Sequence, residues 1–222
     1  ANANLLQRLL TAAVAIPLML LLIFKVPPIG FFVLVVIAVA AAGRELFRMT
    51  HPDDSLSQLV LTLVTVGLSL TEYFFGDDLR TWMAITLVTP LFGLLMPLWR
   101  LGDIKTAAFR AAAGAFGPLY CSLITPVALL LKERGSEGPG YVILVLAISW
   151  MADTFGYFAG RFLGSHKLYE AVSPKKTIEG AIGGLVGSVL SAIVVKILLI
   201  PTLPMEHVVP LALVAGAIGQ MG

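Results

Sequence analysis

The chain has 222 residues, of which 58% are hydrophobic and only 13% are charged, and its mean hydropathy is +0.94. A soluble domain carries about 25% charged residues, so this composition excludes an ordinary water-soluble protein and indicates an integral membrane protein. The net charge of +2 is too small to indicate a nucleic-acid partner, and the single Cys121 excludes an internal disulfide.

Apolar stretches follow one another along the whole chain. A membrane-crossing helix needs about 20 apolar residues. Breaking the sequence at its polar, proline and glycine residues predicts an all-α, polytopic membrane protein with about eight transmembrane helices. The predicted segments are residues 9–24, 29–42, 56–75, 82–99, 106–131, 140–160, 180–200 and 207–222.

The domain organisation follows from the same pattern. We expect residues 1–222 to form a single transmembrane domain, with residues 161–179 as a polar loop. The last segment stays apolar to its end and has no interfacial residues after it, so we expect a domain truncated at the C-terminus.

The basic residues predict the orientation of the segments. If eight segments alternate in direction, ten of the fifteen lysines and arginines fall on the side of the N-terminus. Cytoplasmic loops are enriched in these residues, so this side is predicted to be cytoplasmic. The expected location is the bacterial inner (plasma) membrane, with the 161–179 loop and its site facing the cytoplasm.

Asp153 lies about halfway along the sixth apolar segment. A carboxylate at that depth costs about 2.5–3.5 kcal/mol on insertion scales, so it requires a partner, a metal or a water-filled cavity. Because Asp153, Tyr157 and Gly160 share one helical face, we expect the carboxylate to point into the packed interior. Glycines at every fourth residue from Gly156 to Gly164 favour close helix packing. The alternative is an Asp that is paired for packing alone.

The polar loop contains the densest group of reactive side chains. Ser173, followed by a proline, predicts the N-terminus of a helix that would carry Lys175, Lys176 and Thr177 in its first turn. Such a terminus suits an anionic phosphate group. Glu179 begins the next apolar segment and is a candidate for holding a metal or a lysine. The alternative is an ordinary cytoplasmic loop with a helix cap and a salt bridge.

Other acidic and histidine side chains have simpler interpretations. His51, Asp53 and Asp54 are expected to be solvated loop residues. Glu72 lies on the predicted outer side, away from any cytoplasmic nucleotide.

Two stretches together resemble the phosphatidate cytidylyltransferase (CDP-diacylglycerol synthase) family. The Asp153-Thr-Phe-Gly-Tyr stretch, followed by Gly160-Arg161, looks like the intramembrane acidic motif of that family. The Ser173-Pro-Lys-Lys-Thr-Ile-Glu-Gly stretch looks like its S-P-x-K-T-x-E-G element, at the matching distance. The close match covers about a third of the chain.

The resemblance implies that CTP and phosphatidic acid give CDP-diacylglycerol and pyrophosphate. It implies Mg²⁺ or a similar divalent cation as the cofactor and leaves open whether a second cation binds. It implies a homodimer in membrane lipid. Further metal ligands are expected beyond Gly222. Because residues 1–222 would lack these ligands, one expectation is that this chain is inactive. The predicted catalytic residues are Asp153, Lys176 and Glu179; the predicted substrate-binding residues are Arg161, Lys167, Ser173, Lys175 and Thr177; the candidate metal ligands are Asp153 and Glu179.

Three other functions fit the same residues. A CTP-dependent lipid-alcohol kinase, similar to dolichol kinase, would transfer the γ-phosphate and release CDP. A secondary transporter would use Asp153 as an ion site at a glycine-rich break in a helix. A structural subunit would use the polar residues only for assembly.

Overall fold

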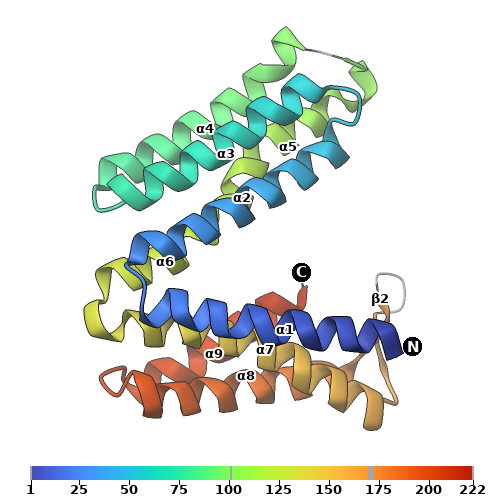
Figure 1. The fold of residues 1–222 in the computed structure, drawn as a ribbon. Helices are drawn as coiled ribbons and strands as arrows, with labels where there is room; N and C mark the ends of the chain where they lie inside the picture. The colour runs from blue at the N-terminus through green and yellow to red at the C-terminus, as the bar shows by residue number, and fades with distance from the viewer. Residues whose placement is uncertain (1, 101, 170–172, 222) are drawn as a thin grey trace. The chain divides into compact units, whose positions relative to one another are not determined.

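The computed structural model describes residues 2–100, 102–169 and 173–221, and helices make up most of it (Figure 1). The chain divides into two compact units, Ala1–Lys132 and Glu133–Gly222. The helices of the first unit are α1 (Asn2–Phe24), α2 (Pro28–Thr50), α3 (Ser55–Phe75), α4 (Leu79–Trp99), α5 (Ile104–Ser122) and α6 (Thr125–Glu133), the last of which ends at the boundary.

The second unit contains three long helices and a short two-stranded ribbon. Its elements are the 3₁₀ turn η1 (Gly135–Glu137), α7 (Gly138–Phe162), β1 (Lys167–Tyr169), β2 (Ser173–Thr177), α8 (Ile178–Leu199) and α9 (Met205–Met221). The strands β1 and β2 are antiparallel, with Lys167 opposite Thr177 and Tyr169 opposite Ser173. Both strands therefore lie within the predicted 161–179 loop.

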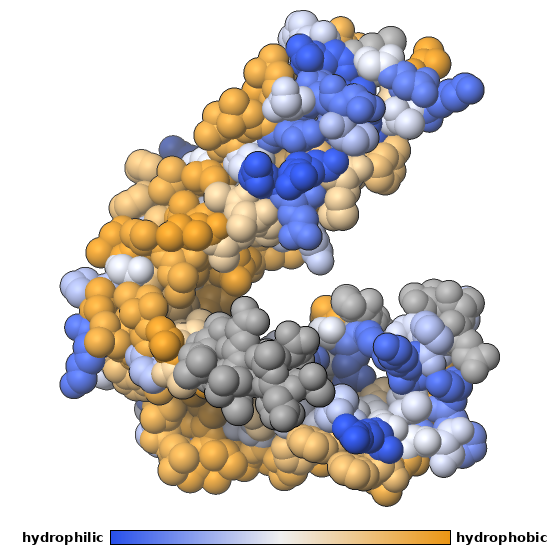
Figure 2. Space-filling view, turned by 45° about the vertical axis from the view of Figure 1, so that its right-hand side comes forward, coloured by the Kyte–Doolittle hydropathy of each residue, from blue (hydrophilic) through white to orange (hydrophobic). Residues whose placement is uncertain are grey.

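The helices confirm an all-α polytopic membrane protein. Within the described residues, six helical stretches are long and apolar enough to cross a membrane, and the stretches Ala13–Phe24 and Met205–Gln220 are apolar but shorter. Each of the eight predicted segments overlaps a helix, so the predicted number agrees only roughly with the six long spans. The predicted 106–131 segment corresponds to Ile104–Glu133, which is broken between α5 and α6. Figure 2 shows apolar side chains over much of the visible helix surface, as expected for a chain solvated by lipid.

A close backbone contact joins α4 and α5 in the first unit. A Cβ added at Gly93 would lie 2.1 Å from the carbonyl carbon of Gly114 and 2.3 Å from the backbone nitrogen of Ala115. These distances leave no room for a side chain, and small residues allow helices in membranes to approach this closely. Phe47 and Leu61 are fully buried nearby and pack with Met96.

A buried carboxylate ties the loops at one end of the first unit. Asp54 caps α3 by accepting a hydrogen bond from the backbone nitrogen of Ser57 at 3.1 Å. It also accepts from Arg100 Nε at 2.9 Å and from Arg110 Nη2 at 3.1 Å. The expectation that His51 and Asp54 are solvated is wrong, because both are buried. Burial alone would raise the pKa of Asp54, but the hydrogen bonds from Arg100 and Ser57 hold it well below its usual range.

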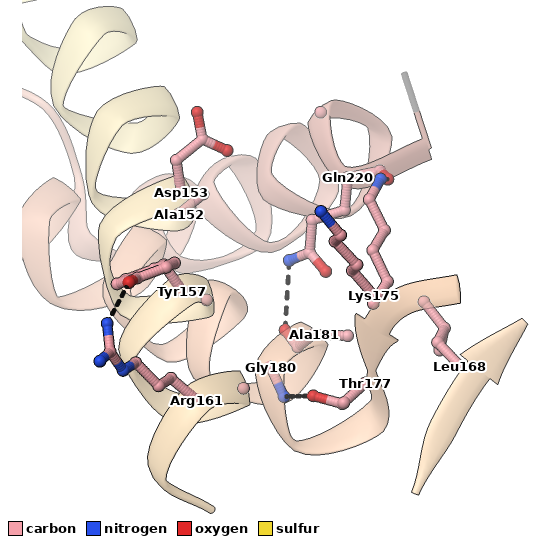
Figure 3. Close-up of a pocket in the computed structure, with 14 residues that line it drawn as sticks. Ala152, Asp153, Tyr157, Arg161, Leu168, Lys175, Thr177, Gly180, Ala181 and Gln220 are labelled. Carbon is pink, nitrogen blue, oxygen red and sulfur yellow. Dashed lines mark hydrogen bonds between the residues drawn. The ribbon is translucent and has the colours of Figure 1, made fainter. Parts of the chain in front are cut away.

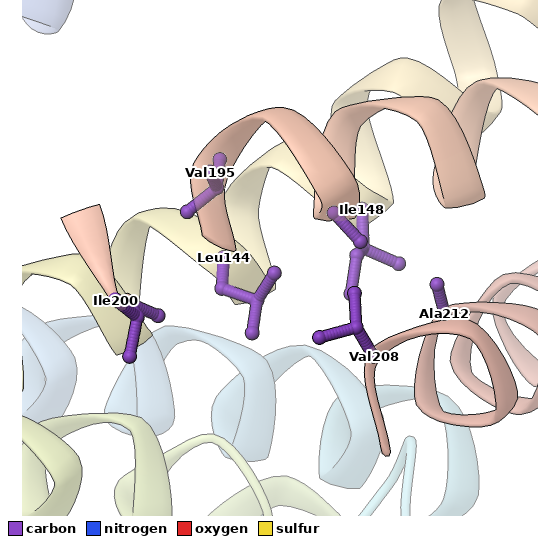
Figure 4. Close-up of a cluster of buried hydrophobic side chains, with 7 residues drawn as sticks. Leu144, Ile148, Val195, Ile200, Val208 and Ala212 are labelled. Carbon is purple, nitrogen blue, oxygen red and sulfur yellow. The ribbon is translucent and has the colours of Figure 1, made fainter. Parts of the chain in front are cut away.

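The core of the second unit lies between α7, α8 and α9 (Figure 4). Leu144 and Ile148 of α7 pack against Val195 of α8 and Val208 of α9. Glycine brings α7 and α8 into backbone contact at their other ends. A Cβ added at Gly180 would lie 3.0 Å from the carbonyl oxygen of Gly156. The predicted glycine packing is therefore confirmed for Gly156 and Gly160, whereas Gly164 lies after the end of α7.

Candidate active site

The polar loop folds differently from its predicted form. Ser173, Lys175 and Lys176 lie on the extended strand β2, so the prediction of a helix capped by Ser173 is wrong. Thr177 is the cap instead, and its Oγ1 accepts a hydrogen bond from the backbone nitrogen of Gly180 at 3.1 Å. Pairing with β1 gives the residues before Thr177 backbone partners in an extended conformation. The lysines therefore precede the helix N-terminus instead of forming its first turn.

An open pocket of about 630 Å³ lies within the second unit (Figure 3). Its charged and hydroxyl-bearing side chains come from α7 (Asp153, Tyr157, Arg161) and from β2 (Lys175, Lys176, Thr177). The first turn of α8 and the end of α9 complete the wall. Four glycines on this wall, Gly156, Gly160, Gly180 and Gly219, leave space because they have no side chains.

Five of the eight predicted site residues line this pocket, namely Asp153, Arg161, Lys175, Lys176 and Thr177. The other three lie outside its lining. Ser173 lines a smaller neighbouring pocket of about 360 Å³, which also includes Lys176. The Lys167 Nζ donates to the carbonyl oxygen of Pro174 at 2.5 Å and so braces the ribbon.

Asp153 stands on the pocket wall. The prediction that it shares a face with Tyr157 and Gly160 is confirmed, since all three line the pocket. The prediction that it points into a packed interior is wrong, because Asp153 is exposed. No hydrogen bond or ion pair joins it to another residue in the described ranges. Its carboxylate therefore has its oxygen lone pairs available for a ligand.

The pocket is predominantly cationic, with three basic side chains and one carboxylate. Arg161 Nη1 donates to the hydroxyl of Tyr157 at 2.6 Å, which orients the guanidinium along α7. Lys176 Nζ donates to the backbone carbonyl of Gln220 at 2.6 Å. No partner of Lys175 is seen among the residues that the structure describes. This balance of charge favours an anionic ligand, and guanidinium and ammonium groups are the usual partners of phosphate.

The Glu179 carboxylate contacts His166 and does not line the pocket. Its carboxylate accepts from the backbone nitrogen of His166 at 3.3 Å and lies 2.7 Å from His166 Nδ1. The backbone nitrogen of Ile178 also donates to the backbone carbonyl oxygen of His166, at 2.9 Å. Glu179 therefore fastens the start of the ribbon to the first turn of α8.

The acidic side chains of the site can be compared with the ligands that a divalent cation requires. Across residues 2–100, 102–169 and 173–221, no three His, Cys, Asp or Glu side chains converge as a metal site. Mg²⁺ is often bound through one or two carboxylates together with phosphate oxygens and water. The unpartnered carboxylate of Asp153, beside the three basic side chains of the pocket, fits that mode of binding.

Sequence reasoning missed Gln220. Its side-chain Nε2 donates to the carbonyl oxygen of Ala181 at 3.2 Å, while its backbone oxygen accepts from Lys176. Gln220 thus joins the end of α9 to both α8 and β2 (Figure 3). One signal was available, because Gln220 is the sole polar side chain after His207 in the last apolar segment.

Comparison with known proteins identifies the family. The model of the cytidylyltransferase family matches residues 6–222. The phosphatidate cytidylyltransferase of Staphylococcus saprophyticus is 25% identical over 218 residues, which cover 97% of this chain and 81% of that protein. The protein of the same name from Bacillus subtilis is 27% identical over 223 residues, covering 97% and 80%. A shorter match, 44% identical over 62 residues, is to the phosphatidate cytidylyltransferase of Staphylococcus aureus. This chain, an integral membrane protein, belongs to the cytidylyltransferase family.

Proposed function

We propose that this enzyme transfers CMP from CTP to phosphatidic acid, giving CDP-diacylglycerol and pyrophosphate for phospholipid biosynthesis. The observation that carries the proposal is the cationic pocket, in which Arg161, Lys175 and Lys176 lie near the unpartnered carboxylate of Asp153. Both substrates are phosphate anions, so the charge of the pocket matches them. The relatives that match 97% of the chain are named for this activity.

The reaction needs mainly positioning and charge neutralisation. An oxygen of the lipid phosphate forms a bond to the α-phosphorus of CTP, and the bond between that phosphorus and the oxygen bridging to the β-phosphorus breaks. Pyrophosphate leaves with the electron pair of the broken bond. Lys175 and Lys176 would bind phosphate oxygens, and Arg161 would hold a further phosphate from the opposite wall. Holding two polyanions together in this way lowers the barrier without a covalent intermediate on the protein.

A divalent cation such as Mg²⁺ fits beside Asp153. When bound, it would neutralise phosphate charge, and Asp153 would be its protein ligand. Glu179 would act at a distance, since its hydrogen bonds to His166 hold the ribbon that carries the two lysines. Thr177 would hold the same ribbon at the start of α8 through its cap.

We place this activity at the bacterial plasma membrane, with the pocket facing the cytoplasm and the CTP found there. The support is the excess of basic residues on the side that carries the 161–179 loop. A homodimer is proposed from the family resemblance alone, and the mass of the purified protein in detergent, measured by light scattering, tests it.

Product analysis tests the proposed reaction. Purified protein in detergent micelles containing phosphatidic acid is incubated with Mg²⁺ and CTP labelled in the α-phosphate or in the γ-phosphate. We expect label from the α-phosphate in the lipid and label from the γ-phosphate in pyrophosphate. Label from the γ-phosphate in a lipid product would instead identify a lipid kinase and refute the proposal.

Two lysine variants link the reaction to the pocket. Lys176→Ala should lower kcat/KM by about 10²-fold, in the range seen when one stabilising group is removed from an active site. Lys196→Ala is the matched control. Lys196 lies in the last turn of α8, at the opposite end of that helix from the ribbon. Equal activity of both variants and the unmodified protein would remove Lys176 from the site.

A further inference from the structure

A buried acidic side chain lies in a membrane-spanning helix of the first unit. Glu72 is on α3 and is only 4% exposed. Its Oε1 accepts a hydrogen bond from Ser122 Oγ at 3.0 Å. Its Oε2 is buried and has no hydrogen-bond partner among the described residues. An unpartnered carboxylate oxygen in such surroundings is energetically unfavourable, so this arrangement favours binding of a further group.

Buried hydroxyl groups lie beside this carboxylate. Ser69, Ser122 and Thr125 are each at most 1% exposed. Ser69 Oγ and Thr125 Oγ1 are 2.8 Å apart, and Thr125 is within interaction range of the Glu72 carboxyl group. Ser122 Oγ can also donate to the carbonyl oxygen of Leu119, at 3.1 Å. Because a hydroxyl has a single proton, Ser122 can bond Leu119 and keep its oxygen lone pairs available to a cation.

The hydroxyl groups flank a break in a membrane-spanning stretch. Ser122 is the last residue of α5, and Thr125 is the first residue of α6. Around the break, the backbone nitrogen of Leu123 donates three residues back to Tyr120 at 3.4 Å, and that of Val127 donates three residues back to Ile124 at 3.1 Å. The regular helical bonding is interrupted here, and carbonyl oxygens at such interruptions can coordinate monovalent cations.

The negative charge of the Glu72 carboxylate has no basic partner among the described side chains. No basic residue in the described part of the chain forms an ion pair with Glu72. Lys132 lies near the neighbouring residue, but its Nζ donates to the carbonyl oxygen of Tyr73 at 2.8 Å and sits 5.2 Å from the centre of the Tyr73 ring. A proton on Oε2 is the competing way to neutralise the charge, with the hydroxyl oxygen of Thr125 as its acceptor. A monovalent cation would instead match the single negative charge and be held by neutral oxygens.

We propose that Glu72, with the hydroxyl groups of Ser69, Ser122 and Thr125, binds a monovalent cation of the Na⁺ or K⁺ class. This site is separate from the pocket of the second unit and does not depend on the reaction proposed for it. Its role is structural, because the cation would join α3 to both sides of the break between α5 and α6.

Thermal unfolding of the full chain in detergent tests the site. Tm is measured against increasing NaCl or KCl, with choline chloride keeping the ionic strength constant. We expect one of the two ions to raise Tm in a saturable way, by roughly 3–6 °C at ten times its Kd. Glu72→Gln should abolish this rise. Glu206→Gln is the matched control and should keep it, because Glu206 is an exposed residue in the first turn of α9.

Three results would overturn the site. The first is equal Tm in all three salts, and the second is an unchanged ion response in Glu72→Gln. The third is a stability that depends on pH through Glu72 but not on the ion, which would mean that Glu72 holds a proton. If Glu72→Gln does not fold, Ser122→Ala and Thr125→Val are used instead. Both should raise the ion concentration at half-maximal effect, and an unchanged midpoint in both would equally refute the site.

Discussion

Replacing Gly93 with alanine should destabilise the first unit, although alanine is the better helix former. The added Cβ would lie 2.1 Å from the carbonyl carbon of Gly114 and 2.3 Å from the nitrogen of Ala115, so α4 and α5 would have to separate. Overpacking of this kind costs about 3 kcal/mol at the upper end of its usual range. The gain in helix propensity offsets up to about 1 kcal/mol, which leaves a net loss of about 2 kcal/mol.

The matched control is Gly67→Ala in α3. A Cβ at Gly67 has no heavy atom within 4 Å, so only the gain in helix propensity should remain. With about 2–4 °C per kcal/mol for a protein of this size, Tm should fall by roughly 4–8 °C in Gly93→Ala and rise by a few degrees in Gly67→Ala.

Intrinsic fluorescence in detergent is a suitable assay, because Trp82 and Trp99 both lie in α4 and report on its environment. The reasoning depends on the opposite signs of the two shifts. An unchanged or higher Tm in Gly93→Ala would refute the close contact between α4 and α5. An equal fall in both variants would show that the close contact at Gly93 does not set the stability of these helices.

Three further predictions concern acidic and capping residues. Asp153→Asn should lower turnover of CTP by at least about 10²-fold, and Tm should stay unchanged because no described residue bonds to Asp153; a large loss of Tm would contradict its placement. Thr177→Val should lose the cap of α8, at about 1 kcal/mol, whereas Thr177→Ser should keep both Tm and activity. The pKa of Asp54 is depressed in the folded state, so its stabilisation is present above the pKa of unfolded Asp, about 3.9, and is lost as the pH falls below it. Tm should therefore fall between pH 5 and pH 3 in the unmodified protein and depend less on pH in Asp54→Asn, which should already be less stable at pH 7; parallel curves would refute this account.

The sequence predicted the helices well because the length and hydropathy of a membrane span are local properties. Each predicted segment overlaps a helix, and Asp153 stands out in the sequence because a carboxylate in an apolar run is rare. The break at residues 123–124 was not predicted, since both residues are apolar and leave the hydropathy of the 106–131 segment unchanged.

Residues whose role depends on distant partners were harder to interpret. Asp54 resembles a solvated loop residue until Arg100 and Arg110, about fifty positions away in sequence, are brought to it. Ser173 and Thr177 are both competent helix caps, and only the pairing of β2 with β1 decides between them. Glu179 has the chemistry of a metal ligand, but a neighbour in space, His166, takes up its carboxylate.

The glycines between α7 and α8 both allow close helix packing and line the pocket. Gly156 and Gly180 bring the two backbones together, and they also form part of the pocket wall. The shape of the pocket therefore cannot evolve independently of the packing of these helices. A substitution that narrows the pocket for a smaller substrate would also push the helices apart. Changes in substrate preference should consequently arise at the rim, from residues such as Leu168, and the glycine wall should tolerate little variation.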